Sequence, residues 1–272
     1  MNELSRRLSL RLIELVHKTR SGPLLAVLRT VFRFKRRIVS TERGKFYLDP
    51  FSHFGYFVLR DGDYEPELRS FLEHNICEGS VFVDVGAHEG YFSVVAAKSA
   101  GRRGRVLAIE PQARLLPILA CNLRINHLEN VQIVDYAVSD EAAVRPMYLQ
   151  PGYNTGGSGF TNRSRWRRPT QEVTTRRLAD ILADHGVDRV DVIKIDIEGY
   201  EYEAILGSPE LFTGRLVDTL AVELHCDEMR ARGRNPDDIS TFLINSGYAL
   251  DRRDSHNLES PYASVVFRVR RR

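Results

Sequence analysis

The sequence predicts an α/β protein with a mostly parallel sheet, an antiparallel hairpin at one sheet edge and additional helices at the N-terminus. Short apolar runs typical of strands alternate with amphipathic helical segments, and this alternation favours right-handed crossovers between parallel strands. The last two strand segments are joined by turn residues alone, which indicates an antiparallel pair. The 272 residues, 43% of them hydrophobic, are sufficient for one such domain.

The first 45 residues differ from the rest in charge and pattern. They contain twelve Lys and Arg against three Asp and Glu, although the whole chain carries a net charge of only +3. Leu4, Leu8 and Leu12 recur at helical spacing, and a second apolar segment spans residues 24–34. We therefore predict a basic, amphipathic helical extension over residues 1–45 and a main domain over residues 46–272.

The extension has two interpretations. Its helices either pack on the main domain, as most amphipathic helices do, or contact a membrane surface or a partner. No apolar run reaches the roughly 18–20 residues of a membrane span, and we find no secretory signal pattern. Three scattered cysteines indicate a reducing compartment. We therefore expect a cytoplasmic protein, either free or peripheral to the membrane.

The strands and helices of the main domain follow from its apolar patterns. Strands are predicted at residues 81–85, 105–110, 131–136, 190–198, 219–225, 248–251 and 263–269. Helices are predicted at residues 90–100, 113–126, 178–186 and 235–246, the last capped by Asn235 with Pro236 at its first position. Residues 150–172 form a long glycine-rich loop around Trp166 and four arginines. This loop is either a lid over a substrate or a flexible basic segment.

The segment DVGAHEG at residues 84–90 joins a predicted strand to a predicted helix, which is where α/β proteins bind ligands. Gly86 permits a tight turn and close approach of a ligand to the backbone. Gly90 opens a helix whose N-terminus attracts negative charge. A loop that binds the pyrophosphate of a dinucleotide would have a glycine where His88 stands. Asp84, at the strand end, favours a ligand that carries a cation, such as an amino group or a sulfonium.

Further candidates follow the next two predicted strands. Glu110 ends the second strand and is suited to accept hydrogen bonds from both hydroxyls of a ribose. Asp135 or Ala137, after the third strand, would then flank the nucleobase attached to that ribose. Because the carboxyl ends of parallel strands meet at one edge of the sheet, these residues predict a site for a nucleoside with a cationic group. Tyr64 and Glu65, which precede the first of these strands, are candidates for closing the end of this site that is opposite the nucleobase.

Five segments together resemble the FkbM family of class I methyltransferases, and the resemblance covers about residues 60–225. They are DVGAHEGYFS, AIEP, AVSD, KIDIEGYE and the pair formed by Asn122 and Asn126. The resemblance implies a seven-stranded Rossmann-like sheet, S-adenosylmethionine as methyl donor and usually a hydroxyl acceptor. The family more often has asparagine where His88 stands. The predicted cofactor contacts are Asp84, Gly86, Ala87, His88, Gly90, Glu110, Asp135, Ala137 and Asp196.

The KIDIEGYE segment and the following strand supply the catalytic candidates. Asp196 ends a predicted strand beside the cofactor, and Glu198 is placed to hold or deprotonate an acceptor hydroxyl. Glu201 and Glu203 are interpreted as a solvated first helical turn. His225 is either a general base, since its ordinary pKa of about 6.5 suits proton abstraction, or a hydrogen-bonded core histidine.

A divalent ion at Asp196, Glu198 and Glu223 is conceivable, because three carboxylates would suit magnesium. The spacing does not demand an ion, and we predict no metal.

The function predicted from these features is O-methylation of a hydroxyl on a sugar, glycoconjugate or secondary metabolite. The alternatives are a methyltransferase acting on RNA or protein, suggested by the basic extension and the loop around Trp166, and a donor-binding scaffold without catalysis. We expect a small-molecule or glycan partner rather than nucleic acid, since the basic charge lies outside the main domain. The oligomeric state is left open.

Overall fold

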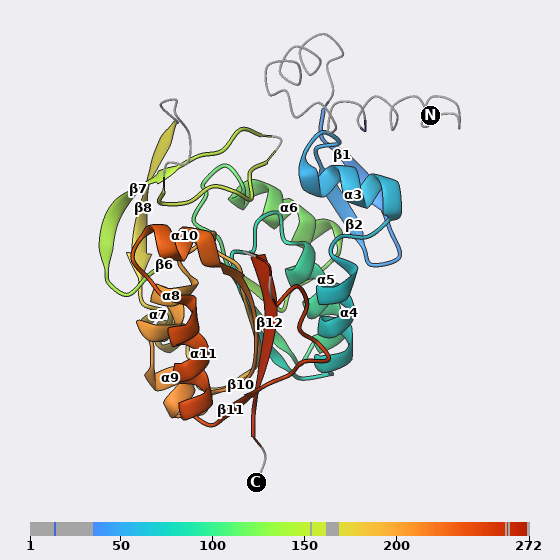
Figure 1. Cartoon of the computed structure of the whole chain (residues 1–272). Coiled ribbons are helices and arrows are strands. Elements are labelled where there is room, and N and C mark those ends of the chain that lie inside the picture. Colours follow the sequence, from blue (N-terminus) through green and yellow to red (C-terminus); the bar gives the residue numbers. More distant parts are fainter. Residues whose placement is uncertain are drawn as a thin grey trace.

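The computed structural model describes residue 14 and residues 35–152, 154–161, 169–258, 260 and 262–270. The predicted helices before residue 35 and the arginines around Trp166 lie outside these ranges. Figure 1 shows a central sheet with helices on both of its faces. No helix within the described ranges has the length and apolar character needed to cross a membrane.

The main sheet has seven strands, as the resemblance implies, in the order β11-β12-β10-β9-β3-β4-β5. Its strands are β3 (Val81–Val85), β4 (Arg105–Ile109), β5 (Val131–Val134), β9 (Val190–Ile195), β10 (Val217–His225), β11 (Tyr248–Leu250) and β12 (Tyr262–Val269). The prediction of a mostly parallel sheet is confirmed, because β5, β4, β3, β9 and β10 pair in parallel. The predicted antiparallel pair, β11 and β12, is also present. Because β12 lies between β10 and β11, only β11 of this pair is an edge strand.

Two helical layers cover the sheet (Figure 1). One layer holds α3 (His53–Asp61), α4 (Pro66–Asn75), α5 (Tyr91–Ala100) and α6 (Leu116–Ile125). The other holds α7 (Leu178–Asp184), α8 (Glu201–Leu206), α9 (Glu210–Thr213), α10 (Cys226–Ala231) and α11 (Pro236–Asn245). The predicted cap of α11 is confirmed, since the Asn235 side chain accepts a hydrogen bond from the Asp237 N–H with Pro236 at the first turn.

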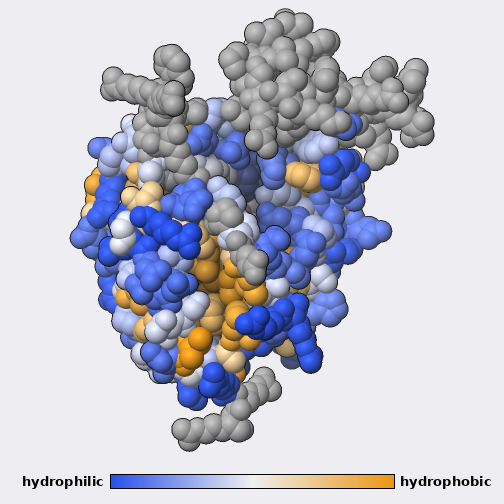
Figure 2. Space-filling view, viewed as in Figure 1, coloured by the Kyte–Doolittle hydropathy of each residue, from blue (hydrophilic) through white to orange (hydrophobic). Residues whose placement is uncertain are grey.

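Successive residues of each central strand enter opposite cores. Val83, Val85 and Ile193 belong to the core on the α7–α11 side, whereas Phe82 and Val192 belong to the core on the α4–α6 side. Both faces of these strands are therefore apolar, which is why the runs in the sequence are continuous rather than alternating. Figure 2 shows polar side chains over most of the visible surface and apolar ones gathered between α11 and β12, along the edge of the sheet.

Two smaller sheets were absent from the sequence-based assignment. A hairpin of β1 (Arg37–Ser40) and β2 (Lys45–Leu48) occupies the end of the predicted helical extension, so residues 37–45 are not helical. The second sheet joins β6 (Ala137–Val138), β8 (Thr170–Arg176) and β7 (Ala143–Tyr148). It frames the segment predicted as a loop over residues 150–172, whose last residues are part of β8.

Candidate active site

A pocket, here called the central pocket, lies at the carboxyl ends of β3, β4, β9 and β10. It brings together most of the residues that the sequence analysis singled out. Those that line it are Tyr64, Glu65, Gly86, Ala87, His88, Glu110, Ala137, Asp196, Glu198, Glu223 and His225. They come from segments up to 161 residues apart in the chain, and the parallel register of the strands places their ends together.

The turn after β3 forms one wall of the central pocket. Gly86 has a φ of +82°, and a Cβ at this position would lie 2.0 Å from the carbonyl oxygen of Asp196. Only glycine therefore permits the ends of β3 and β9 to approach so closely. The Lys194 ammonium fixes the same turn, since its Nζ donates a 2.8 Å hydrogen bond to the Gly86 carbonyl.

Glu110 is buried at the end of β4 and holds the same turn from the other side. One carboxylate oxygen accepts from the His88 N–H and the other from the Gln112 N–H, both at 2.9 Å. Burial raises the pKa of Glu110 to about 7, against the opposing effect of these two hydrogen bonds and of Lys194. Each oxygen retains a lone pair, so the carboxylate can still accept hydroxyl groups from a ligand in the pocket.

A strap of residues 154–160 borders the central pocket on the side of His88. The Thr155 hydroxyl and His88 Nε2 share a 2.6 Å hydrogen bond, and Gln112 Nε2 donates to the Thr155 carbonyl. At the other end of the strap, the Phe160 and Tyr200 ring centroids lie 4.7 Å apart. The described part of the glycine-rich loop thus contributes residues to the pocket wall.

Three predicted cofactor contacts do not line the central pocket. Asp84 points from β3 toward α5 on the same side as Phe82, where its Oδ2 accepts a 2.6 Å hydrogen bond from the Ser93 hydroxyl. Gly90 is the N-cap of α5, and a Cβ added to it would lie 2.3 Å from Leu119 Cδ1. Asp135 is exposed, because β5 ends at Val134 and the next side chain faces outward. Tyr136 and Val138 line the pocket beside Ala137 instead.

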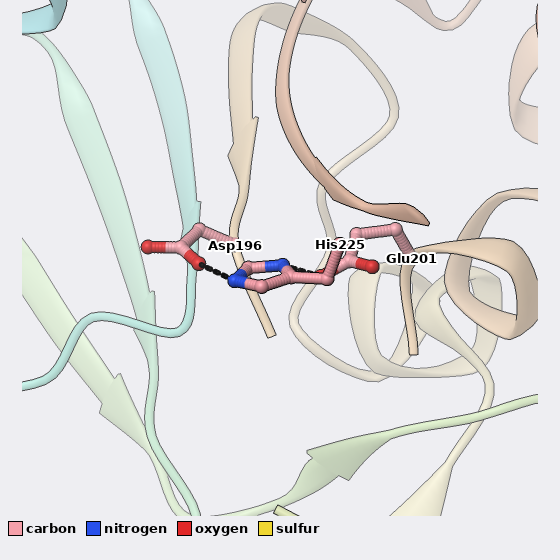
Figure 3. Close-up of side chains that lie close together, drawn as sticks. All are labelled: Asp196, Glu201 and His225. Atoms are coloured by element: carbon pink, nitrogen blue, oxygen red, sulfur yellow. Dashed lines mark hydrogen bonds and ion pairs between the residues drawn. The ribbon is translucent and has the colours of Figure 1, made fainter. Parts of the chain in front are cut away.

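The three catalytic candidates converge at the end of the pocket nearest β10, and Figure 3 shows two of them with Glu201. His225 is buried, and its Nε2 lies 3.9 Å from Asp196 Oδ1 and 3.7 Å from Glu198 Oε2. Its other nitrogen, Nδ1, shares a 2.9 Å hydrogen bond with Glu201 Oε1. His225 is therefore neither a solvent-facing base nor a histidine bonded to a backbone carbonyl, but the centre of a carboxylate cluster.

Glu201 and Glu203 are buried, and the expectation of a solvated helical turn is wrong. Glu201 Oε1 accepts hydrogen bonds from the Ile197 and Gly199 N–H groups as well as from His225. Glu203 is paired with the guanidinium groups of Arg232 and Arg234. The periodicity of α8 did not reveal this, because the groups that bury both side chains come from segments more than 20 residues further along the chain.

Electrostatics change the role expected of His225. Burial lowers its pKa, but the hydrogen bond to Glu201 and the charges of Glu201, Asp196 and Glu198 outweigh burial and raise the pKa to about 10. A histidine that is already protonated at neutral pH cannot accept a proton, so this cluster does not support a simple general base. Burial and the charge of Asp196 also raise the pKa of Glu65 to about 7 and that of Glu223 to about 8.

Lys194 is the functional candidate that sequence reasoning missed. It is 3% exposed, lines the central pocket and lies 3.5 Å from a carboxylate oxygen of both Asp84 and Asp196. Burial lowers its pKa, yet the charges of Asp196, Asp84, Glu65 and Glu223 outweigh burial and hold the pKa above its usual value. The sequence does contain a signal for this role, namely a lysine inside a strand whose two faces are otherwise apolar. A lysine is buried in such a strand only when its charge is paired.

S-adenosylmethionine fits the residues of the central pocket. Glu110 is positioned for ribose hydroxyls, and Ile109, Tyr136 and Ala137 provide an apolar surface for the base. The carboxylates of Glu65, Asp196 and Glu223 at the other end suit the positive charges of the methionine part and of the sulfonium. The fold and this site together define a class I methyltransferase.

Comparison with known proteins agrees with this class. The family model described as "Methyltransferase FkbM domain" matches residues 84–250, more than half of the chain. The chain belongs to the FkbM methyltransferase family, and S-adenosylmethionine is its cofactor.

Three curated relatives are similar over parts of the chain. The AMB antimetabolite synthetase AmbE of Pseudomonas aeruginosa is 26% identical over 70% of this chain and 10% of its own length. The methyltransferase sdnD of Sordaria araneosa is 29% identical over 50% of this chain and 63% of its own. A protein-L-isoaspartate O-methyltransferase of Caenorhabditis elegans is 27% identical over 67% of this chain and 78% of its own. The chain thus spans less than two thirds of the first two relatives.

Proposed function

We propose that this methyltransferase methylates a hydroxyl oxygen of a small polyhydroxylated acceptor, such as a sugar, a glycoconjugate or a secondary metabolite. The observation that carries the proposal is the convergence of Asp196, Glu198 and His225 at the end of the central pocket where a second pocket joins it. Bound S-adenosylmethionine supplies a methyl group on a positively charged sulfur, which is already activated for transfer.

The second pocket, here called the side pocket, supports the class of acceptor. It meets the central pocket at Glu65, Lys194, Asp196 and Glu223 and runs toward β12. Its remaining polar lining consists of Glu67, His256, Asn257, Tyr262 and Ser264. Hydroxyl, amide, imidazole and carboxylate groups in one cavity offer both donors and acceptors, which suits a ligand with several hydroxyl groups. We infer that the acceptor enters here.

The chain's contribution to the reaction is mainly to position the acceptor. Asp196 and Glu198 are the carboxylates suited to receive the hydrogen of an acceptor hydroxyl and to orient its oxygen toward the donor. Holding two reactants in a productive geometry contributes up to about 7–11 kcal/mol to the lowering of a barrier. The strap of residues 154–160 would limit the entry of water from the His88 side.

The proposal is tested by incubating the full chain with S-adenosylmethionine labelled at the methyl group and with fractionated extract of cells that express it. We expect label in the small-molecule or glycan fraction and in a product stable to mild alkali, since methyl ethers resist the hydrolysis that releases methanol from methyl esters. Asp196→Asn should reduce the rate by roughly 100-fold, the scale of lost positioning. Exposed Glu172 on β8 provides the control variant Glu172→Gln, which should retain the wild-type rate.

Label in the RNA fraction or in protein would overturn the proposal and favour the other acceptor classes. An alkali-labile product would show transfer to a carboxyl group rather than to a hydroxyl. Cofactor binding without transfer to any fraction would instead favour a scaffold without catalysis.

A further inference from the structure

The cluster around His225 has the arrangement of a metal-binding site. Its Nδ1 shares a hydrogen bond with Glu201 on one side of the ring, and its Nε2 faces the Asp196 carboxylate on the other (Figure 3). The Glu198 carboxylate also lies near Nε2. The His225 side chain is 5% exposed, and no hydrogen bond to Nε2 occurs among the described residues. In the neutral form of the imidazole, this buried nitrogen would present its lone pair to a cation held between the two carboxylates.

The distances fit such a cation. Nitrogen and oxygen ligands about 2.0–2.2 Å from a divalent ion are about 3.0–3.5 Å from one another in octahedral or tetrahedral coordination. His225 Nε2 lies 3.7 Å from Glu198 Oε2 and 3.9 Å from Asp196 Oδ1, slightly beyond hydrogen-bonding distance. Rotation of the Asp196 and Glu198 side chains toward each other would complete three ligands around one ion, with the pocket side left open.

Glu201 has the features of an outer-shell group. It is fully buried, it fixes the orientation of the His225 ring through Nδ1, and two backbone N–H groups hold its Oε1 in place. Its Oε2 is buried without a hydrogen-bond partner among the described residues. Histidines that bind metals regularly donate their second N–H to a carboxylate in this way, which fixes the tautomer and strengthens the ligand.

The local charge favours a cation as well. Asp196, Glu198 and Glu201 each have a carboxylate oxygen within 4 Å of the His225 ring nitrogens, and Lys194 lies 3.5 Å from Asp196. A cation balances these carboxylates, and it is either the protonated imidazole itself or a metal ion bound to the neutral imidazole.

We propose that Asp196, Glu198 and His225 bind a divalent transition-metal ion, with Glu201 as the outer-shell partner of His225. One imidazole and two carboxylates suit Mn²⁺, Fe²⁺ or Zn²⁺ better than Mg²⁺ or Ca²⁺, which prefer oxygen alone. This replaces the expectation, drawn from sequence spacing, that no metal is present. The role of the ion rests on the proposed function: it would bind the acceptor hydroxyl and lower its pKa beside the donor.

The test is a titration with MnCl₂ of the full chain, which is first treated with a chelator. Binding is measured from the electron paramagnetic resonance signal of free Mn²⁺. We expect one Mn²⁺ bound per chain and displacement by ZnCl₂. His225→Gln should weaken Mn²⁺ binding at least tenfold, and Glu201→Gln should weaken it by about 10–100-fold, as outer-shell changes do. His74→Gln, at an exposed histidine of α4, should bind Mn²⁺ as the wild type does.

Circular dichroism would verify that each variant is folded. Glu198→Gln, at a side chain 19% exposed, gives a second ligand variant if Glu201→Gln does not fold. Undiminished free Mn²⁺ with the wild type, or equal affinity in His225→Gln, would overturn the proposal and leave a protonated histidine balanced by carboxylates. Because the titration contains neither donor nor acceptor, its outcome is independent of whether methyl transfer to a hydroxyl is found.

Discussion

At the scale of single residues, Glu110 is a buried acid that follows β4 and lines the central pocket. It is 3% exposed, and Lys194, Asp84 and Arg114 are the charged groups that act on it or respond to it. Its pKa is raised from 4.5 to about 7, mainly by burial. In the folded protein without cofactor, the protonated carboxyl is therefore favoured at mildly acidic pH.

This shift predicts a pH dependence of stability. A folded-state pKa above the unfolded value means that the stabilisation is fully present below pH 4.5 and is lost as the pH rises through about 7. The loss amounts to roughly 3 kcal/mol at most, at about 1.4 kcal/mol per pKa unit. Urea unfolding of the cofactor-free protein between pH 4.5 and 8 measures it. Glu110→Gln should flatten this slope, and an unchanged slope would contradict the assignment.

Gly86 gives a prediction about close packing. In Gly86→Ala the methyl group would meet the carbonyl oxygen of Asp196, whereas Gly79, with a similar φ of +86°, has nothing within 4 Å of an added Cβ. Gly79→Ala should therefore cost only the left-handed backbone strain of about 1–2 kcal/mol. Gly86→Ala should cost roughly a further 1–3 kcal/mol from overpacking. Thermal unfolding of the two variants compares them, and equal losses would show that β3 and β9 do not approach so closely.

Residue roles were predictable from sequence only where position on a strand determined them. Glu110, Asp196 and His225 follow short apolar runs, and strand ends meet at one edge of a parallel sheet whatever the rest of the chain does. The direction of Asp84 and the burial of Glu201 depend on contacts across the chain with Ser93 and His225. No local pattern contains that information.

At the scale of elements, Asn122 on α6 and Asn126, the C-cap of α6, hold the strand β2 against the domain. Asn122 Oδ1 accepts from the Tyr47 N–H, and its Nδ2 donates to the Glu89 carbonyl. Asn126, one turn later, bonds both backbone groups of Lys45. The two amides thus complete the hydrogen bonding of a short edge strand.

These amides differ in burial, which makes them a matched pair. Asn122 is fully buried, so Asn122→Ala should leave the Tyr47 N–H and the Glu89 carbonyl without partners and reduce stability by about 2–4 kcal/mol. Asn126→Ala should cost less than about 1 kcal/mol, because water can reach the exposed backbone of Lys45. Urea unfolding of both variants tests this, and comparable losses would contradict the structural role of Asn122.

The strands that the sequence predicted are mostly apolar, whereas the strands it did not predict are short or half-exposed. The central strands β3, β4 and β9 have nearly continuous apolar runs because both of their faces are covered. The strands β1, β2, β6 and β7 have mixed or brief patterns, and their pairing partners lie elsewhere in the chain. Strand β12 enters between β10 and β11, a long-range pairing that the turn residues before it do not specify.

At the scale of the whole molecule, the parallel register places the central pocket and the side pocket at the carboxyl ends of the strands of the main sheet. Glu110 lies at one end of the central pocket and the cluster around His225 lies at the other. Lys194 is part of β9, the strand between β3 and β10. The side pocket opens from the second of these ends. In the proposed function, the cofactor takes the β3 and β4 side of this region and the acceptor takes the β10 and β12 side.

The central claim is that the central pocket binds S-adenosylmethionine with Glu110 beside its ribose. Isothermal titration of the full chain with S-adenosylmethionine tests it most directly, with Glu110→Ala as the pocket variant and Glu172→Gln as the surface control. We predict one site per chain, unchanged affinity in Glu172→Gln and at least tenfold weaker binding in Glu110→Ala, equivalent to about 1.4 kcal/mol or more. Absence of binding by the wild type, or equal affinity of Glu110→Ala, would contradict the account.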